Sequence, residues 1–201
     1  MRMHRKDNLD ARLEACADIM TGADLMEKNM KKAAQMKAYI NFEEVFGNGN
    51  PVHLEIGCGK GGFVCGMATL HPDINFIAVE KVSNVIVTAC ESAKQAELKN
   101  VHFINCPAEV LPRYIRESCI ARIYLNFSDP LPKLGYAAQR LTNPRFLEIY
   151  KTILVRGGQI WQKTDNEALF DYSLQSCEEG GWKVEEVCRD VAAHPFEGYV
   201  I

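Results

Sequence analysis

Short apolar runs alternate with segments of helical spacing along most of this chain, and this alternation constrains the fold more than any other feature. The apolar runs lie at 52–56, 75–79, 101–105, 122–126, 159–163 and 182–187, with helices expected at 63–70, 84–98, 109–117, 144–154 and 166–178. Strands that alternate with helices indicate βαβ units and right-handed crossovers. We therefore expect an α/β fold with a Rossmann-like, doubly wound parallel sheet. Its strand order should be 3-2-1-4-5, with the sixth strand beyond and helices on both faces.

The first 50 residues differ from the rest of the chain. They are polar and charged, with one stretch of helical character from about Ala23 to Tyr39. The run Gly47-Asn48-Gly49-Asn50-Pro51 that follows is a strong turn signal. A chain of 201 residues suits one α/β domain with a short extension. We interpret residues 1–50 as an N-terminal arm or lid and residues 51–201 as the domain itself.

Composition and charge argue against several classes of protein. The formal net charge is −3, so any nucleic-acid binding must come from local patches. The eight cysteines include no Cys-x-x-Cys pair, so no metal site is expected, and we expect reduced thiols in a cytoplasmic protein. No apolar run is long enough to cross a membrane, and none follows the basic start of the chain. We therefore expect neither a membrane partner nor a signal peptide.

A glycine-rich segment follows the first predicted strand and leads into the first predicted helix. It contains the pattern Glu55-x-Gly57-x-Gly59-x-Gly61, and Glu80 ends the second predicted strand 23 residues after Gly57. Glycines let the backbone approach a ligand closely, and a helix N-terminus offers unpaired N–H groups. The Glu80 carboxylate can accept hydrogen bonds from both ribose hydroxyls of an adenosine. The pattern therefore predicts a site for an adenosine-containing cofactor.

Several ligands fit such a loop. A P-loop is excluded, because Lys60 is followed by glycine rather than by serine or threonine. A nicotinamide dinucleotide site stays open if Gly62 supplies the third glycine, and so does a glycine turn without a ligand. We favour S-adenosylmethionine, because a carboxylate at Glu55 would attract its cationic methionine end, whereas a pyrophosphate would gain nothing from it. The predicted cofactor residues are Glu55, Gly57, Gly59, Gly61 and Glu80.

A second candidate segment follows the fourth predicted strand, and it reads NFSDPLPK at 126–133. Ligands of a doubly wound sheet bind outside the carboxyl ends of its strands, so this loop should lie beside the reactive end of the cofactor. Asp129 could present a carboxylate to a substrate, with Pro130 restricting its backbone. It could equally cap an Asx turn, which is common before proline. The local sequence leaves both interpretations open.

Longer strings give the chain a closer resemblance. They are YLNFSDP at 124–130, RLTNPRFL at 140–147 and KTDNEALFDYSL at 163–174. Together with VFGN at 45–48 and the opening MRM, they resemble the bacterial tRNA (guanine-N7)-methyltransferase family. Members of that family are class I S-adenosylmethionine-dependent methyltransferases. The similarity extends from about Val45 to Asp190 and rests most specifically on NFSDP and KTDN.

This resemblance implies an activity and a role for particular residues. The activity is transfer of a methyl group from S-adenosylmethionine to N7 of the variable-loop guanine, position 46, of tRNA. Guanine N7 has an available lone pair, so no general base is required and catalysis can rest on positioning and electrostatics. The implied residues are Glu55 and Glu80 for the cofactor, Asp129 as the catalytic acid and as a further cofactor-binding residue, and Lys133, Arg140 and Asp165 for the tRNA.

The loop after Asp129 departs from the family pattern. Leu131 replaces the usual tryptophan, and the basic residues of the family are reduced to Lys133 and Arg140. Since phosphate contacts supply most non-specific affinity for nucleic acids, we expect weaker RNA binding than in relatives. The wider segment 133–156 still contains five cations, Lys133, Arg140, Arg145, Lys151 and Arg156, against the single acid Glu148.

Two more departures concern the adenine side and the end of the chain. Pro107 stands where the family usually has an acid that contacts the adenine amino group, and the candidate replacements are the Ala108 N–H and Glu109. The chain ends at Ile201, before a substrate-contacting segment and the last antiparallel strand of the family. We therefore expect that strand to be missing from the sheet.

Two other functions stay open at this stage. The first is a small-molecule methyltransferase that uses S-adenosylmethionine on the same fold. The second is a non-catalytic or weakly active variant that binds the cofactor or RNA, which the neutral loop and the early chain end would suit. Dependence of turnover on tRNA would separate these functions from the first. The sequence does not distinguish a monomer from a homodimer.

Overall fold

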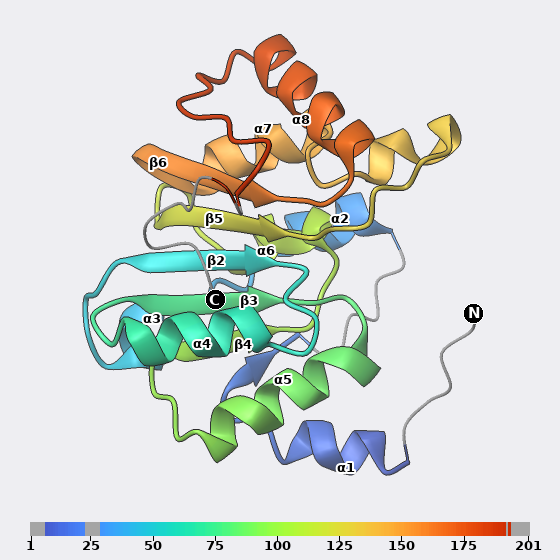
Figure 1. The fold of residues 1–201 in the computed structure, drawn as a ribbon. Helices are drawn as coiled ribbons and strands as arrows, with labels where there is room; N and C mark the ends of the chain where they lie inside the picture. Colours follow the sequence, from blue (N-terminus) through green and yellow to red (C-terminus); the bar gives the residue numbers. More distant parts are fainter. Residues whose placement is uncertain (1–6, 23–28, 192, 194–201) are drawn as a thin grey trace.

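The protein folds around a parallel sheet with helices on both faces (Figure 1). A computed structural model describes residues 7–22, 29–191 and 193. The strands of the described part are β1 (Met20–Thr21), β2 (Val52–Ile56), β3 (Asn75–Val79), β4 (Val101–Ile104), β5 (Ile120–Asn126) and β6 (Leu154–Lys163). Their order is β1-β4-β3-β2-β5-β6, and each neighbouring pair is parallel. The prediction numbered the strands from 52–56, which is β2, so the segment β4-β3-β2-β5-β6 is the predicted order 3-2-1-4-5. The predicted fold class is confirmed.

The longer helices lie where the spacing predicts them. They are α4 (Gly62–Leu70), α5 (Ser83–Gln95), α7 (Pro144–Ile153) and α8 (Glu167–Glu179). Asn143 and Asn166 begin α7 and α8, and their side chains accept hydrogen bonds from the backbone N–H groups of Arg145 and Leu169. The segment predicted as one helix at 109–117 is instead a turn of 3-10 helix, η1 (Ala108–Val110), and the short helix α6 (Leu111–Tyr114). Pro112 fits there because the first turn of a helix needs no N–H donor.

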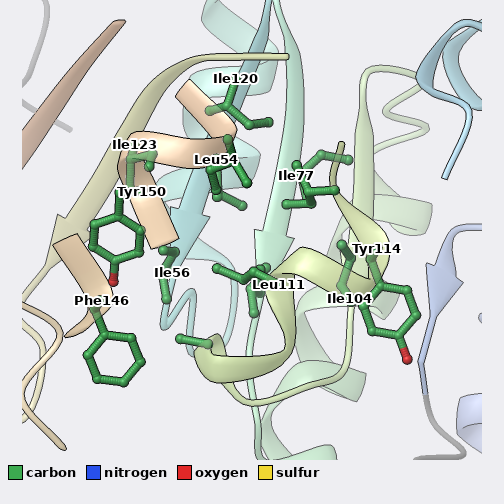
Figure 2. Packing of buried hydrophobic residues seen from close by; sticks show 14 of the residues in the cluster. Leu54, Ile56, Ile77, Ile104, Leu111, Tyr114, Ile120, Ile123, Phe146 and Tyr150 are labelled. Atoms are coloured by element: carbon green, nitrogen blue, oxygen red, sulfur yellow. The ribbon is translucent and has the colours of Figure 1, made fainter. Parts of the chain in front are cut away.

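Successive residues of each strand face opposite layers of the core. Leu54 and Ile56 of β2 belong to the layer that includes α6, α7 and the short helix α2 (Met30–Gln35). Figure 2 shows this layer, with Leu54, Ile56 and Ile77 of neighbouring strands packed together under Leu111. The opposite layer contains Phe76, Ala78 and Tyr124, covered by α4, α5 and the helix α1 (Leu9–Glu14). Glu55, between Leu54 and Ile56, is therefore directed away from the layer in Figure 2.

Residues before β2 add a strand that the sequence pattern does not predict. Met20 and Thr21 form β1, which extends the sheet beside β4. The preceding helix α1 lies along α5 (Figure 1), where the Arg12 guanidinium makes two hydrogen bonds of 2.6 Å with the Glu91 carboxylate. Buried Cys16 belongs to the same core layer as α5. A two-residue strand is too short for a periodicity signal, so only packing identifies it.

The helix predicted from Ala23 to Tyr39 is wrong in its extent. Helix α2 covers only Met30–Gln35, residues 23–28 lie outside the described structure, and α3 (Phe42–Phe46) follows. After α2 the backbone leaves the helix, and the N–H groups of Ala38 and Ile40 donate to the carbonyl oxygens of Arg113 and Tyr114. These hydrogen bonds to α6 replace those that a longer helix would have made internally.

The strand predicted at Trp182–Val187 is also wrong, because residues 182–188 have no regular secondary structure. Their alternating pattern resembles a strand, but Val184 and Val187 are exposed and the segment pairs with no strand of the described sheet. Trp182 instead closes α8, since its N–H donates to the Cys177 carbonyl. Among the described residues, no helix combines the length and apolar character needed to cross a membrane.

Candidate functional site

The carboxyl ends of the parallel strands place the predicted site residues along one edge of the sheet. Glu55 lies next to the last residue of β2 and is only 2% exposed. The Asn126 side-chain N–H donates to its Oε1 at 3.0 Å, while its Oε2 has no hydrogen-bond partner among the described residues. Burial raises the pKa of the Glu55 carboxyl to about 7, although the bond from Asn126 opposes this shift. A buried carboxylate with an unsatisfied oxygen suits a cationic ligand.

The glycine loop crosses the end of β3 before α4 begins. The N–H groups of Gly57 and Cys58 both donate to the Val79 carbonyl, at 2.8 and 3.0 Å. Gly57 has φ 82°, and a Cβ added there would meet nothing within 4 Å, so its backbone is open to a ligand. Gly59 is similarly open. Gly61 differs, because a Cβ there would come within 2.7 Å of the Ala89 Cβ, and it therefore serves the packing of the loop on α5.

Glu80 connects the glycine loop to the end of β3. Its Oε1 accepts a hydrogen bond from the Val82 N–H at 2.9 Å, and its Oε2 accepts one from the Gly59 N–H at 3.3 Å. A carboxylate has about four acceptor positions, so two are left for the hydroxyls of a ribose. The side chain is partly exposed, which is compatible with such a ligand.

Asn105 supports this corner of the site, although the sequence pattern did not single it out. Its side-chain N–H donates to the Glu80 backbone carbonyl at 2.8 Å, and its Oδ1 accepts from the Ser83 hydroxyl at 2.7 Å. Its backbone N–H donates to the Thr21 carbonyl of β1 at 2.9 Å. One buried residue therefore joins β1, the end of β3 and the start of α5. An asparagine at the end of an otherwise apolar predicted strand was the available signal.

The adenine side contains the two candidate replacements for the family's acid. Glu109 is engaged elsewhere, because its Oε1 accepts a 2.6 Å hydrogen bond from Arg145 at the start of α7. Ala108 is buried at the first position of η1, directly after Pro107. The first N–H groups of a helix have no partner within the helix. The geometry therefore favours the Ala108 N–H over the Glu109 carboxylate as the group available to a ligand.

Asp129 lies in the loop that leaves the carboxyl end of β5. Its side chain is exposed, and within the described part of the chain no hydrogen bond or ion pair engages its carboxylate. The Asx turn considered from the sequence is therefore not formed. Phe127 and Leu131, on either side of Asp129, have φ values of 46° and 45°. Positive φ is uncommon for residues with a Cβ, so this loop holds a strained backbone on both sides of the acid.

The predicted tRNA contacts are placed in two different ways. Lys133 is exposed just before the 3-10 segment η2 (Leu134–Gln139), and Asp165 is exposed in the loop after β6. Both loops leave the sheet at the edge that bears Glu55 and Asp129 (Figure 1). Arg140 is partly buried, and its guanidinium donates to the carbonyl oxygens of Pro130 and Leu131. Its hydrogen bonds are thus made within the loop.

Other cations of the segment 133–156 also have partners within the protein. Arg145 pairs with Glu109, and the Lys151 ammonium donates to Glu148 and to the Gly180 carbonyl at 2.8 Å each. Lys133 and Arg156 are exposed. The surface available to RNA phosphates is therefore less basic than a count of the five cations suggests. The described residues include no group of three or more His, Cys, Asp or Glu side chains that could hold a metal ion.

Comparison with known sequences identifies close relatives. A family model described as "Putative methyltransferase" matches residues 49–195. The chain is 40% identical over 201 residues to the tRNA (guanine-N(7)-)-methyltransferase of Bacillus subtilis (strain 168), covering 100% of this chain and 89% of that protein. It is 44% identical over 159 residues to the protein of the same name from Listeria innocua, covering 79% of this chain and 74% of that one.

Comparison with solved structures supports the fold. An antibiotic-related methyltransferase superposes with a TM-score of 0.55 at 16% identity, covering 82% of this chain and 80% of that chain. Precorrin-6y C5,15-methyltransferase from Geobacter metallireducens GS-15 gives 0.55 at 16% identity, with 84% and 80% covered. At such low identity these similarities establish the class I methyltransferase fold and do not address the substrate.

Proposed function

The chain belongs to the tRNA (guanine-N(7)-)-methyltransferase family, and from this membership we propose how its own residues carry the reaction. It is an S-adenosylmethionine-dependent enzyme that methylates N7 of guanine in tRNA. We propose the variable-loop guanine at position 46 as the target. The observation that carries the mechanism is that two acids lie at the carboxyl ends of neighbouring parallel strands, Glu55 buried in β2 and Asp129 exposed after β5.

The cofactor half of the proposal rests on Glu55, Glu80 and the glycine loop. S-adenosylmethionine supplies a methyl group on a positively charged sulfur. The buried Glu55 carboxylate, with its free Oε2, would bind the cationic amino acid end of this molecule. Glu80 would accept hydrogen bonds from the ribose hydroxyls, while Gly57 and Gly59 leave room for the chain between the two ends. Asn126 keeps the Glu55 side chain in place through its hydrogen bond.

The substrate half rests on Asp129. Because N7 of guanine carries its own lone pair, no side chain has to remove a proton before transfer. An exposed carboxylate can accept hydrogen bonds from the N1–H and the N2 amino group of the target base. It would orient N7 and offset the positive charge that develops on the purine. Lys133 and Asp165 would contact the surrounding tRNA from the two neighbouring loops.

The test is methylation of a defined tRNA transcript. The protein is incubated with unmodified tRNA and methyl-labelled S-adenosylmethionine, and the product is cleaved chemically at N7-methylguanine. We expect one cleavage at guanine 46 and none in a matched transcript with adenine at that position. Label in another base, or turnover that does not depend on tRNA, would contradict the proposal and favour the small-molecule alternative.

A weakly active or non-catalytic variant is the second candidate, favoured by one specific observation. The loop that carries Asp129 continues into an apolar surface, with Leu134 87% exposed and Tyr136 48% exposed. Basic residues at such positions would attract the RNA phosphates, whereas these uncharged side chains do not. Binding of labelled tRNA and cofactor without methyl transfer, under conditions in which the Bacillus subtilis relative is active, would establish this variant.

We also propose an arrangement for the whole chain. Residues 1–50 would act as an arm that is attached to the methyltransferase domain 51–201 through β1, which pairs with β4 of its sheet. We expect the enzyme to act in the cytoplasm, where its tRNA substrate is found, as a monomer or homodimer. Light scattering coupled to size-exclusion chromatography would determine the oligomeric state.

A further inference from the structure

Arg140 makes three hydrogen bonds to the loop that carries Asp129. Its Nε donates to the Pro130 carbonyl at 3.1 Å and, more weakly, to the Leu131 carbonyl at 3.4 Å. Its Nη2 donates to the same Leu131 carbonyl at 3.1 Å. The guanidinium therefore bridges two successive peptide groups directly after Asp129. A planar fork of N–H donors fits this arrangement, and a lysine ammonium would not reproduce it.

Helix α8 supports the guanidinium from another side. The Arg140 guanidinium carbon lies 4.3 Å from the centre of the Tyr172 ring, within the range of a cation–π interaction. The Tyr172 hydroxyl accepts a 2.8 Å hydrogen bond from Asn143, the residue that caps α7. Arg140 is thus held between the loop and two helices.

The loop needs such support because its backbone is strained. Phe127 and Leu131 both have positive φ, a conformation that is unfavourable for residues with a Cβ and persists only where the surroundings enforce it. On the first side of Asp129, the Phe127 N–H donates to the Lys163 carbonyl of β6 at 2.8 Å. On the C-terminal side of Asp129, Arg140 holds the loop through the Pro130 and Leu131 carbonyls. The acid lies between these two attachments.

We propose that Arg140 is a positioning residue, which fixes the 130–131 turn and thereby the direction of the Asp129 carboxylate, and that it is not a phosphate contact. This inference rests on the proposed function of Asp129. The resemblance to the family implied that Arg140 contacts tRNA, whereas this proposal gives it the role of holding the loop in shape. Because a small displacement of an orienting group lowers the rate without altering substrate affinity, the two roles differ in what they affect.

The experiment compares Arg140→Lys and Arg140→Gln with the parent. If Arg140 positions the loop, single-turnover methylation at saturating tRNA should fall on the order of 10- to 100-fold in both variants. The dissociation constant for tRNA and its salt dependence should stay within about twofold of the parent. Lys133→Gln serves as the comparator for a phosphate contact, and it should weaken tRNA binding and reduce the salt slope by about 1.

A second pair of variants tests the support from α8 without changing charge. Tyr172→Phe keeps the ring and should retain most of the rate, whereas Tyr172→Ala should slow transfer in the same way as Arg140→Lys. The overturning result is that Arg140→Lys retains the parent rate while Arg140→Gln weakens tRNA binding and reduces the salt slope. Arg140 would then be a phosphate contact after all.

Amide hydrogen exchange makes the inference testable without turnover. In both Arg140 variants the amide of Phe127 should exchange at least about 10-fold faster than in the parent, with the melting temperature and cofactor affinity nearly unchanged. Unchanged exchange would overturn the positioning role whatever the activity. If the parent methylates no tRNA, the proposed function fails, and hydrogen exchange still decides whether Arg140 orders this loop.

Discussion

The two halves of the carboxyl edge of the sheet differ in how far the protein itself completes them. In the cofactor half, Glu80 is bound to the Gly59 N–H, and Asn105 is bound to the Glu80 carbonyl. In the substrate half, Asp129, Lys133 and Asp165 are exposed. The Asp129 carboxylate makes no hydrogen bond or ion pair with another described residue. One half is a set of internally bonded side chains, and the other presents side chains to solvent.

The size of the two proposed ligands would account for this difference. A small cofactor is enclosed by few groups, which must be held in place before it binds. A tRNA covers a wide surface, and its phosphates can select among exposed side chains on arrival. The exception in the substrate half is the backbone of the Asp129 loop, which Arg140 holds in a strained form. Under the proposed roles, the loop backbone orients the acid beside the target base, and the exposed side chains around it bind the rest of the tRNA.

The largest effect on this contrast between the two halves is expected for Asp129→Asn. The amide can accept through one oxygen only, and its NH₂ would face a donor on the guanine edge. We expect the activation free energy of methyl transfer to rise by about 3–4 kcal/mol, which lowers the single-turnover rate on the order of 10²- to 10³-fold. Cofactor affinity, measured in parallel by calorimetry, should be nearly unchanged because the residue lies outside the cofactor half. A variant that methylates at the parent rate would show that the exposed acid has no catalytic role.

The next largest effect is expected in how Glu55 makes the stability of the protein depend on pH. The pKa of this acid is raised by burial from 4.5 to about 7, so the folded state holds the proton more tightly than the unfolded state. Its contribution to the free energy of unfolding is fully present below about pH 4.5. This contribution, about 3 kcal/mol, is lost as pH rises through 7. Glu55→Gln should lack this loss.

Urea denaturation of the parent and of Glu55→Gln between pH 5 and 8 measures the difference. The free energy of unfolding of the parent should fall relative to the variant as pH rises. Equal pH dependence in the two proteins would mean that Glu55 is not buried as a protonated acid. Cofactor affinity should increase with pH in the parent, because the carboxylate is the form that binds a cation, and this increase should disappear in the variant.

Glu80→Ala tests the bonded corner of the cofactor half. It removes the charged acceptor of the Gly59 and Val82 N–H groups together with the proposed ribose contact. We expect S-adenosylmethionine to bind about 1.5–3 kcal/mol more weakly, or roughly 10- to 150-fold. Glu80→Gln keeps one acceptor oxygen and should give a smaller loss. Unchanged affinity in the alanine variant would show that Glu80 only holds the loop through the Gly59 and Val82 N–H groups and does not bind the cofactor.

The smallest effect is expected in the salt dependence of tRNA binding. Three of the five cations in the segment 133–156 have partners within the protein. The slope of log affinity against log salt should therefore be shallower than about −5. A steeper slope would require a larger basic surface, to which Arg2, Arg5 and Lys6, outside the described residues, could contribute. Filter binding over a range of salt concentrations is sufficient for the measurement.

Local patterns in the chain were enough to predict the positions of five strands, four long helices and the glycine loop with Glu55 and Glu80. They were enough because hydrophobic periodicity and turn chemistry act over a few residues. The same patterns predicted a strand at 182–187, which is wrong because alternation does not supply a neighbouring strand to pair with. Strand β1 was not predicted for the opposite reason, since its two residues are defined only by their pairing with β4.

The partners of the polar side chains, in contrast, depend on how distant segments pack. Asn105 reaches Glu80 across 25 positions of the chain, and Glu109 pairs with Arg145 across 36. Arg140 turns to carbonyl groups 9 and 10 positions earlier and to a ring on α8. A charged residue in a loop looks the same in sequence whether it faces RNA or the protein's own backbone. Only the folded chain brings a buried acceptor within about 3 Å of a donor, and the donor satisfies that acceptor because leaving it unpaired would cost free energy.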